Sequence, residues 1–475
     1  MLLETVKSEG LAHLSYVLGD DSQGVCAVID PRRDVSIYLD IARHNNCRIT
    51  HIFETHIHAD FVSGARELAS QSGAPIYGGE ADNYGFEIQQ LHEGERFELG
   101  RLCVQVLHTP GHTPEHVCFL VSGGKGSSEP WGLFSGDTLF AGEVGRPDLL
   151  GGGSEEKLAR ALYHTLHDKL LKLGDEVEIY PAHGEGSPCG GSIGDRNTST
   201  IGYERLNSPK LQADSEDEFV RQVLAGLPPA PTYYPRMKKV NASGPKVLGC
   251  IANLQPLDPQ RFAQEMKAQS TLILDAREIE AFGGAHIKGA LNIALRAEFP
   301  VWSGWMLQPE QRLLLVLADE GDVDEVQRHL LRIGIENVGG FLRHGMRGWI
   351  EAGLSFETLP QISVHQLKER IERRDGLQVL DVRQDDEWEQ GYVPTARHAF
   401  VPKVPEAMND FDRDQPIATY CGSGYRASIA AGLLQKSGFR EVYNVPGSMK
   451  AWKAASYPLE GGDSKPTPDS NPADS

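Results

Sequence analysis

The chain has 475 residues, a length that indicates about three domains and excludes a single small module. It carries 46 Lys and Arg against 66 Asp and Glu, and the net charge of −20 argues against binding to nucleic acid or to an anionic membrane. No apolar run approaches the ~20 residues that span a bilayer, so no membrane segment is expected. The seven cysteines are sparse and Met1 starts no recognisable secretory leader, so we expect a reducing, cytoplasmic location.

Residues 1–211 are expected to form one domain that mixes strands and helices. Residues 11–30 alternate apolar and polar positions, which predicts a β-hairpin. The apolar run 49–53 predicts a buried strand that leads into a histidine-rich loop. The other predicted elements are helices at 35–46, 62–71 and 155–171 and strands at 102–107, 116–121, 132–134 and 176–180.

Residues 212–248 interrupt this pattern. A short helix and a proline-rich run at 228–231 favour extended backbone that buries little. We therefore predict a linker here, followed by two further domains at 249–358 and 361–458. The tail, residues 459–475, is rich in Pro, Ser, Asp and Gly, which predicts disorder.

The second half of the chain contains an internal repeat. Asp275-Ala276-Arg277 and Asp381-Val382-Arg383 each follow a leucine, and each is followed by a similar glycine- and alanine-containing stretch. Residues 340–349 resemble residues 446–452, and both segments end in tryptophan. Each copy of about 100 residues alternates strands with helices, so we predict two α/β domains with parallel sheets.

Four short segments of the first domain place potential metal ligands beside small residues. They are 56–60 (His-Ile-His-Ala-Asp), 109–113, 135–138 and 180–184, and each lies at an expected strand end or tight turn. Side chains at such positions converge at one edge of a β-sandwich, and neutral imidazoles with a carboxylate suit Zn or Fe. That these histidines are ordinary polar residues explains any one segment, but not four in this order. The sequence therefore predicts a metal centre.

These four segments resemble those of the metallo-β-lactamase superfamily, over residues 1–210. The resemblance implies an αββα sandwich here, and a multidomain α/β protein overall. Hydrolases of the superfamily, such as glyoxalase II, usually carry a histidine directly after His-x-His-x-Asp that helps to hold a second metal, but this chain has Phe61. Because a phenyl ring offers no lone pair, we expect one metal rather than two.

Two imidazoles and one carboxylate leave open positions for substrate and O2, as in non-haem Fe(II) oxygenases. The chain looks like the persulfide dioxygenases at His56, His112, Asp137 and residues 142–148. Those enzymes oxidise a persulfide of glutathione or a related thiol to sulfite at mononuclear iron. The resemblance implies one Fe(II) per chain, bound by His56, His112 and Asp137. It also implies three residues that orient these ligands: His58, Asp60 and His183. A residual second metal site is the alternative for those three.

Two residues near these segments have two interpretations each. Arg146 binds an anionic substrate through its guanidinium fork, or it forms a structural ion pair with Asp148. Cys189 lies in a small-residue loop after His183, where an exposed thiol of lowered pKa would relay or trap sulfur. A passive loop cysteine is the preferred interpretation, because the sequence gives no evidence on the pKa of this thiol. Both residues are candidates for substrate binding.

A second reactive site is predicted in the last domain. The apolar run 417–420 leads into Cys421-Gly422-Ser423-Gly424-Tyr425-Arg426, and a helical pattern follows. Backbone N–H groups of such a loop favour a negative charge at its centre, so we expect Cys421 to be a thiolate nucleophile and its persulfide to be held as an anion. Residues 422–425 would bind the sulfur group, and Arg426 would add a positive charge. A merely buried cysteine is the alternative.

This loop and the repeat resemble rhodanese domains, over residues 250–358 and 361–458. The resemblance maps the family's catalytic cysteine onto Cys421, which takes up a sulfane sulfur as a persulfide and yields it to a thiol or sulfite. The first copy has Ala318 at the corresponding position, and no cysteine lies between Cys250 and Cys421. We expect this copy to be catalytically silent and to hold the active domain, bind a ligand or form an oligomer interface.

Together the resemblances imply a persulfide dioxygenase fused to rhodanese domains. Such a protein would act on a thiol persulfide, O2, sulfite and thiosulfate. Its role would be sulfide detoxification or sulfur assimilation, and we expect it to form a homo-oligomer. One alternative is a zinc thioester hydrolase of the glyoxalase II kind fused to rhodanese domains, which Phe61 disfavours. A second alternative is a sulfur-carrier or sensing scaffold without turnover.

Overall fold

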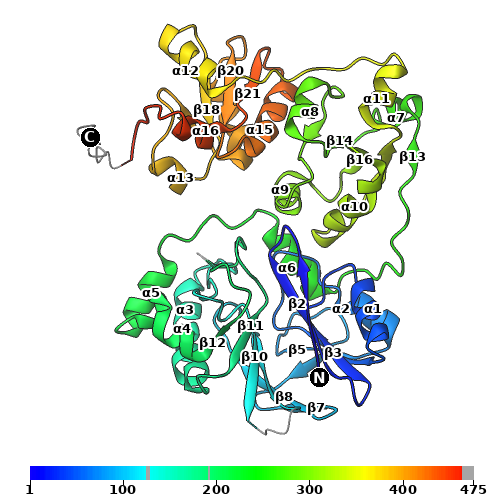
Figure 1. The fold of residues 1–475 in the computed structure, drawn as a ribbon, viewed down its shortest axis with the longest axis vertical. Coiled ribbons are helices and arrows are strands. Elements are labelled where there is room, and N and C mark those ends of the chain that lie inside the picture. Colours follow the sequence, from blue (N-terminus) through cyan, green and yellow to red (C-terminus); the bar gives the residue numbers. More distant parts are fainter. Residues whose placement is uncertain (125–128, 191–192, 463–475) are drawn as a thin grey trace, which may run out of the picture. The chain divides into compact units, whose positions relative to one another are not determined.

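The structure is a computed structural model that describes residues 1–124, 129–190 and 193–462 (Figure 1). Its backbone forms two compact units. Unit 1 comprises Met1–Ala252 with the short segments Pro300–Leu307 and Gln327–Glu336, and unit 2 comprises the other described residues. None of the helices in these ranges has both the length and the apolar character that a bilayer span requires.

Unit 1 contains two six-stranded sheets. The first sheet consists of β1 (Leu2–Ser8), β2 (His13–Asp20), β3 (Val25–Ile29), β4 (Arg48–Phe53), β5 (Ile76–Gly79) and β6 (Gln89–Leu91), in that order. The second consists of β7 (Arg96–Leu99), β8 (Leu102–His108), β9 (Val117–Gly123), β10 (Pro130–Gly136), β11 (Glu178–Pro181) and β12 (Ser199–Thr200), in the order β12-β11-β10-β9-β8-β7. The predicted hairpin is confirmed, because β2 and β3 pair antiparallel.

The two sheets share one apolar core, and helices cover their outer faces. Tyr16 of β2 packs in the core with Val104 of β8, whereas the neighbouring Val17 points to the other face. That outer face is covered by α1 (Ser36–His44) and α2 (Ala65–Ser72). The second sheet is covered by α3 (Glu155–His164), α4 (Ile201–Asn207) and α5 (Glu216–Leu224). The predicted αββα sandwich is confirmed.

Residues 212–248 differ from the extended linker that the composition predicts. They contain α5 and α6 (Tyr234–Ser243), with the proline-rich run between the two helices. Phe219 of α5 is fully buried in the same cluster as Leu162 of α3. The segment therefore belongs to unit 1, which extends to Ala252.

The side chain of Asn241 ties α6 to the loop after β4. It donates to the backbone oxygens of His58 and Phe61 at 2.8 and 2.7 Å and accepts from the Ser63 N–H at 2.9 Å. We expect Asn241→Ala to lower the unfolding free energy of unit 1 by about 3 kcal/mol, because three buried backbone groups lose their partner.

Denaturant unfolding, followed by a probe in unit 1, measures this effect. Asn207→Ala is the matched control, because Asn207 makes a single exposed bond to the Tyr203 carbonyl. The control should change stability by less than about 0.5 kcal/mol. Equal effects of the two substitutions would contradict the structural role of Asn241.

The chain beyond residue 252 contains two all-parallel sheets, which confirms the prediction. The first consists of β13 (Pro256–Leu257), β14 (Thr271–Asp275), β15 (Leu291–Asn292), β16 (Arg312–Val316) and β17 (Val338–Leu342), in the order β13-β17-β16-β14-β15. The second consists of β18 (Gln378–Asp381), β19 (Arg397–His398), β20 (Ile417–Tyr420) and β21 (Val442–Asn444), in the order β19-β18-β20-β21. The α-helices here are α7 (Pro259–Glu265), α8 (Ile279–Gly284), α9 (Phe299–Met306), α10 (Val323–Arg332), α11 (Gly345–Glu351), α12 (Val364–Arg373), α13 (Asp385–Glu389), α14 (Val404–Ala407), α15 (Tyr425–Lys436) and α16 (Ser448–Ala454).

The repeat extends to individual side chains. Arg277 follows β14 and pairs with Asp275, and Arg383 follows β18 and pairs with Asp381. The Nη2–Oδ2 distance is 2.6 Å in both ion pairs. Residues 463–475 of the expected tail lie outside the described residues, but Glu460 exchanges two backbone hydrogen bonds of 2.8 Å with Tyr392, so the ordered chain extends past 459.

Candidate functional site

The loops after β4 and β8 and the turn after β10 bring three potential ligand atoms together. His56 Nε2 and His112 Nε2 lie 3.7 and 3.5 Å from Asp137 Oδ2. All three residues are buried, and Asp137 Oδ2 has no hydrogen-bond partner within the described chain. Two atoms that bind one ion at about 2.1 Å and roughly 100° apart are separated by about 3.2 Å. The three side chains therefore fit a metal ion.

Hydrogen bonds to the other ring nitrogens fix the tautomers of both histidines. The Thr55 hydroxyl lies 2.9 Å from the Asp30 carboxylate and 2.9 Å from His56 Nδ1. Because the carboxylate only accepts, Thr55 donates to Asp30 and accepts from His56 Nδ1–H. His112 Nδ1 lies 2.8 Å from the carbonyl oxygen of Arg146, which also only accepts. Both rings therefore carry the proton on Nδ1 and leave the Nε2 lone pair for a metal.

A further histidine, His116, positions the carboxylate and was not identified from the sequence. Its Nε2 accepts the Asp137 N–H at 3.0 Å, which requires a neutral ring. Burial lowers the pKa of His116 to about 3, and it lowers the pKa of His112 to about 4. The available signal was its position four residues after His112.

His183 lies between two carboxylates. Its Nδ1 is 2.7 Å from Asp137 Oδ1, and its Nε2 is 2.9 Å from Asp60 Oδ2. Burial alone would lower the pKa of His183, but the two carboxylates raise it to about 10. Both nitrogens then donate, so in this arrangement His183 has no lone pair for a metal.

The Nε2 atom of His58 faces a pair of carboxylates that does not include Asp137. Its Nε2 lies 3.1 Å from Asp30 Oδ1 and 3.4 Å from Glu54 Oε2, and all three residues are buried. Burial opposes protonation, yet these carboxylates raise the pKa of His58 well above its usual value. Asp30 and Glu54 were missed from the sequence, although each is a charged residue directly after a buried strand.

Phe61 occupies the position where related hydrolases carry a histidine. Its ring is fully buried between His13 and His58, with ring centroids 4.0 and 4.5 Å away. The side chain at this position therefore offers no lone pair to a second metal.

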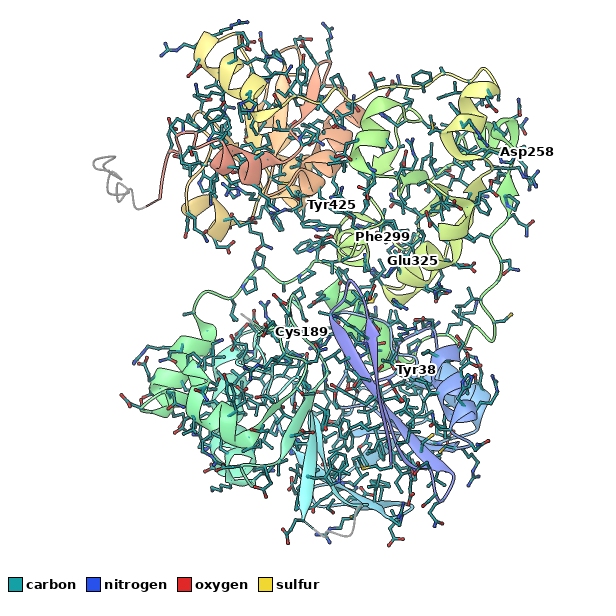
Figure 2. All side chains as sticks on the ribbon, viewed as in Figure 1. Tyr38, Cys189, Asp258, Phe299, Glu325 and Tyr425 are labelled. Atoms are coloured by element: carbon teal, nitrogen blue, oxygen red, sulfur yellow. The ribbon has the colours of Figure 1, made fainter. Side chains whose placement is uncertain are left out.

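Cys189 is buried, which contradicts the exposed thiol required for the sulfur-relay interpretation. It is 1% exposed, and burial raises the pKa of its thiol well above the usual value (Figure 2 labels the residue). Its sulfur lies 3.9 Å from the Tyr234 hydroxyl. With Asp60 and His183 it forms a second group of possible metal ligands, although both nitrogens of His183 already face carboxylates.

Arg146 is also buried, and its guanidinium is committed to the protein. It donates to Asp148 through Nε and Nη2, both at 2.7 Å, and to the carbonyl oxygens of Pro188 and Pro228 at 3.0 and 2.9 Å. This supports the ion-pair interpretation and corrects the assignment of Arg146 to substrate binding, because its donors are directed at protein acceptors.

In unit 2, Cys421 stands between β20 and α15, as the sequence predicts. Its sulfur accepts the Gly424 N–H at 3.1 Å, and its own N–H donates to Ser448 Oγ at 3.0 Å. Gly424 has φ +110°, and a Cβ there would lie 3.1 Å from Pro446 Cα. Glycine is therefore needed to turn this N–H toward the sulfur.

Arg426 and Tyr425 follow the same loop. Arg426 pairs with Glu387, with an Nη2–Oε1 distance of 2.7 Å. Burial would lower the pKa of Arg426, but Glu387 and Cys421 raise it above its usual value. The Tyr425 hydroxyl donates to the carbonyl oxygen of Ala294 at 2.8 Å, so it faces the first copy of the repeat. Glu387 was not identified from the sequence.

The corresponding loop of the first copy holds no nucleophile. Ala318 follows β16, and Asp319 and Glu320 come next. Their carboxylates accept the N–H groups of Gly321 and His344 at 2.7 and 2.8 Å. Acidic side chains thus occupy this loop, which places negative charge where the second copy has Gly422 and Ser423 after its cysteine.

Family models match two parts of the chain. The model of the metallo-beta-lactamase superfamily matches residues 9–183, and that of the rhodanese-like domain matches residues 258–352 and 363–455. These two domain types indicate an enzyme.

Individual proteins show the same likeness. A crystal structure of a metallo-beta-lactamase from Staphylococcus aureus is 34% identical and covers 72% of this chain and 98% of its own, with a TM-score of 0.65. A hydroxyacylglutathione hydrolase from Methylococcus capsulatus is 33% identical over 171 residues, 35% of this chain and 60% of the relative. The crystal structure of ETHE1 from Myxococcus xanthus is 26% identical and covers 51% of this chain and 99% of its own, with a TM-score of 0.45.

Proposed function

The chain belongs to the metallo-beta-lactamase superfamily and carries two rhodanese-like domains, and we propose that it is a persulfide dioxygenase joined to a thiosulfate sulfurtransferase. The first activity oxidises a low-molecular-weight thiol persulfide, such as glutathione persulfide, to sulfite and thiol. The second moves sulfane sulfur between persulfide, sulfite and thiosulfate. Tethering raises the effective concentration of one site near the other, which suits a shared intermediate.

The observation that carries the proposal is the set of ligand atoms available to a metal. His56, His112 and Asp137 turn one atom each toward a common position, whereas His58 and His183 face carboxylates. Two imidazoles and one carboxylate with open positions suit Fe(II) and O2. One ferrous ion bound there would supply the electron transfer to O2, which no side chain supplies.

The proposed oxidation balances without another reductant. One persulfide, one O2 and one water give one thiol, one sulfite and two protons. The terminal sulfur loses four electrons and O2 gains them. The protein contributes orientation, because Thr55 and the Arg146 carbonyl fix the two rings, and exclusion of bulk water, because the ligand residues are buried.

The proposed sulfur transfer proceeds by two substitutions at sulfur. The Cys421 thiolate attacks the outer sulfur of a persulfide, the S–S bond breaks, and the thiol leaves as a thiolate. Sulfite then attacks the outer sulfur of the Cys421 persulfide, which releases thiosulfate and restores the thiolate. The Gly424 N–H, which donates to the sulfur, and the nearby charge of Arg426 favour the anionic forms.

A zinc thioester hydrolase joined to rhodanese domains is the second candidate, favoured by the identity to the hydroxyacylglutathione hydrolase. The purified chain, loaded separately with iron and with zinc, is tested for O2 uptake with glutathione persulfide and for hydrolysis of S-lactoylglutathione. O2 uptake confined to the iron form supports the dioxygenase. Thioester hydrolysis by the zinc form without O2 uptake supports the hydrolase.

Phe61→His restores the histidine that dinuclear relatives carry. We expect bound zinc to rise from one toward two ions per chain, because hydrolases of the superfamily use a histidine at this position to help hold a second metal. O2 uptake by the iron-loaded variant should fall, since a second ion would occupy open space. Metal analysis measures the first effect, and Phe61→Leu is the control that should retain one ion. Unchanged stoichiometry in the histidine variant would contradict the assigned role of Phe61.

A further inference from the structure

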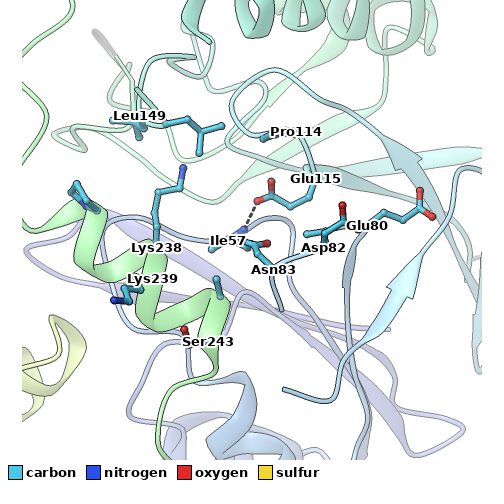
Figure 3. A pocket seen from close by; sticks show the side chains of 14 residues that line it. Ile57, Glu80, Asp82, Asn83, Pro114, Glu115, Leu149, Lys238, Lys239 and Ser243 are labelled. Carbon is cyan, nitrogen blue, oxygen red and sulfur yellow. Dashed lines mark hydrogen bonds between the residues drawn. The ribbon is translucent and has the colours of Figure 1, made fainter. Parts of the chain in front are cut away.

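The cavity beside the loop after β4 is lined by charged side chains that already interact within the protein. It has a volume of about 730 Å³ and lies next to Ile57, whose N–H donates to Glu115 Oε1 at 2.9 Å (Figure 3). Lys238 of α6 lies close to Glu115, and Glu80 Oε1 lies 2.9 Å from His92 Nδ1. These side chains therefore do not define a charged ligand for the cavity.

A different feature of the molecule is the contact between the two copies of the repeat at the start of α15. Gly424, whose N–H donates to the Cys421 sulfur, directly precedes this helix. The next residue, Tyr425 (labelled in Figure 2), donates through its hydroxyl to the Ala294 carbonyl oxygen of the first copy at 2.8 Å. Burial raises the pKa of Tyr425 well above its usual value, so the hydroxyl keeps its proton. The start of α15 is therefore attached to the first copy.

A second hydrogen bond joins the same part of α15 to the first copy. The Ser428 hydroxyl donates to Asn292 Oδ1 at 2.7 Å, and both side chains are fully buried. The amide nitrogen of Asn292 donates to the carbonyl oxygens of Asp275 and Arg277 at 3.0 and 2.9 Å. Because these two bonds fix the amide, its oxygen is held toward Ser428. Asn292 thus connects the end of β14 to α15.

The equivalent residue of the second copy is His398, which also ends the short strand after the Asp-x-Arg segment. Its Nε2 donates to the Arg383 carbonyl oxygen at 2.7 Å, as the amide nitrogen of Asn292 donates to that of Arg277. Its Nδ1 lies 3.6 Å from Asp385 Oδ1, within the same copy. The bond to the Asp-x-Arg segment is therefore common to both copies, whereas Asn292 also bonds to the other copy.

We propose that the first copy positions the sulfur-binding loop of the second, through the side chain of Asn292 and the carbonyl group of Ala294. This inference rests on the proposed sulfur transfer, because it assigns a role at the same site. The Gly424 N–H stabilises an anionic sulfur only while it points at that sulfur, and a misplacement of about 1 Å can cost about 10²-fold in rate. The two bonds to α15 limit such a shift. Asn292 is a positioning residue that acts through α15.

Asn292→Ala in the full chain tests the proposal from outside the second copy. Loss of the bond to Ser428 should lower kcat for thiosulfate formation from glutathione persulfide and sulfite by about 10-fold, with little change in either KM. Ser428→Ala should also lower kcat. The double variant should lose little more than Asn292→Ala alone, because both substitutions remove the same bond. Gln435→Ala is the matched control, since Gln435 in the last turn of α15 donates to the Thr358 carbonyl oxygen at 3.0 Å, and kcat should not change.

Hydrogen exchange followed by mass spectrometry provides a readout that needs no turnover. The amides of residues 421–428 should exchange faster in Asn292→Ala and in Ser428→Ala than in the native chain, because this part of α15 is held less firmly. Their exchange should be unchanged in Gln435→Ala. Ser428→Ala leaves the first copy intact, so it decides the outcome if Asn292→Ala does not fold.

The outcomes separate this inference from the proposed sulfur transfer. Native kcat in Ser428→Ala and in folded Asn292→Ala would overturn the positioning role, whatever the exchange rates, and leave the sulfurtransferase intact. Absence of transfer by the native chain, together with faster exchange of residues 421–428 in the variants, would overturn the sulfurtransferase and leave the positioning of the loop intact. An equal loss of kcat in Gln435→Ala would indicate general damage to α15 and overturn the assignment.

Discussion

Cys421→Ser should reduce thiosulfate formation from persulfide and sulfite by at least about 10³-fold, because a serine hydroxyl cannot replace the thiolate as a sulfur acceptor. The fold of the loop should survive, since a hydroxyl can accept the Gly424 N–H that now reaches the sulfur at 3.1 Å. The oxygen uptake that we assign to unit 1 should persist.

The measurement is the rate of thiosulfate production, and mass spectrometry after persulfide treatment checks whether residue 421 carries an extra sulfur. Cys250→Ser is the matched control, because that thiol is exposed and lies outside the loop. Transfer activity that survives in Cys421→Ser would contradict the nucleophile, whereas full loss would exclude a scaffold without turnover.

Asp137→Asn should remove iron from unit 1 and with it the oxygen uptake. Its carboxylate contributes the Oδ2 atom that faces His56 and His112, and an amide is a poorer ligand for Fe(II). Even residues that only orient ligands change metal affinity by about 10- to 100-fold, so loss of a ligand should exceed that range. Iron analysis after dialysis and oxygen uptake measure the effect.

Asp60→Asn provides the matched control. Asp60 contacts His183 rather than the three ligand atoms, so we expect iron to be retained and oxygen uptake to fall less than in Asp137→Asn. Loss of metal from both variants alike would indicate a site that includes Asp60, as in a dinuclear centre, and would contradict the three-ligand assignment.

Local patterns in the sequence were sufficient to predict much of the fold. The alternation in residues 11–30 gives the β2–β3 hairpin, in which Tyr16 faces Ile29. The repeated Asp-x-Arg segments give two parallel sheets with matching ion pairs. The predicted helix at 155–171 is α-helical only to His164 and then continues as π- and 3₁₀-helical turns.

The role of residues 212–248 was not predictable from composition. Their prolines indicate a linker, but the position of α6 depends on tertiary bonds such as those of Asn241 to the backbone of His58 and Phe61. These two hydrogen bonds join residues that lie 183 and 180 positions apart in the sequence. No local pattern reports them.

The candidate site, like the fold, was predictable from the sequence only in part. The family resemblance implied that His56, His112 and Asp137 share one metal, and the structure brings them within reach of one ion. The partner of the second ring nitrogen decides which histidines remain available to a metal. For His112 and His183 these partners lie 34 to 123 positions away in the sequence. Arg146 illustrates the point, because its donors go to Pro188 and Pro228 as well as to the nearby Asp148.

The central claim is that one iron ion in unit 1 oxidises a persulfide. Its most direct test is the stoichiometry of O2 consumption by the Cys421→Ser chain, because sulfur transfer then removes no product. With one iron per chain, we predict that each glutathione persulfide consumes one O2 and yields one sulfite. Two tightly bound zinc ions per chain, with thioester hydrolysis and no O2 consumption in any metal form, would contradict the account.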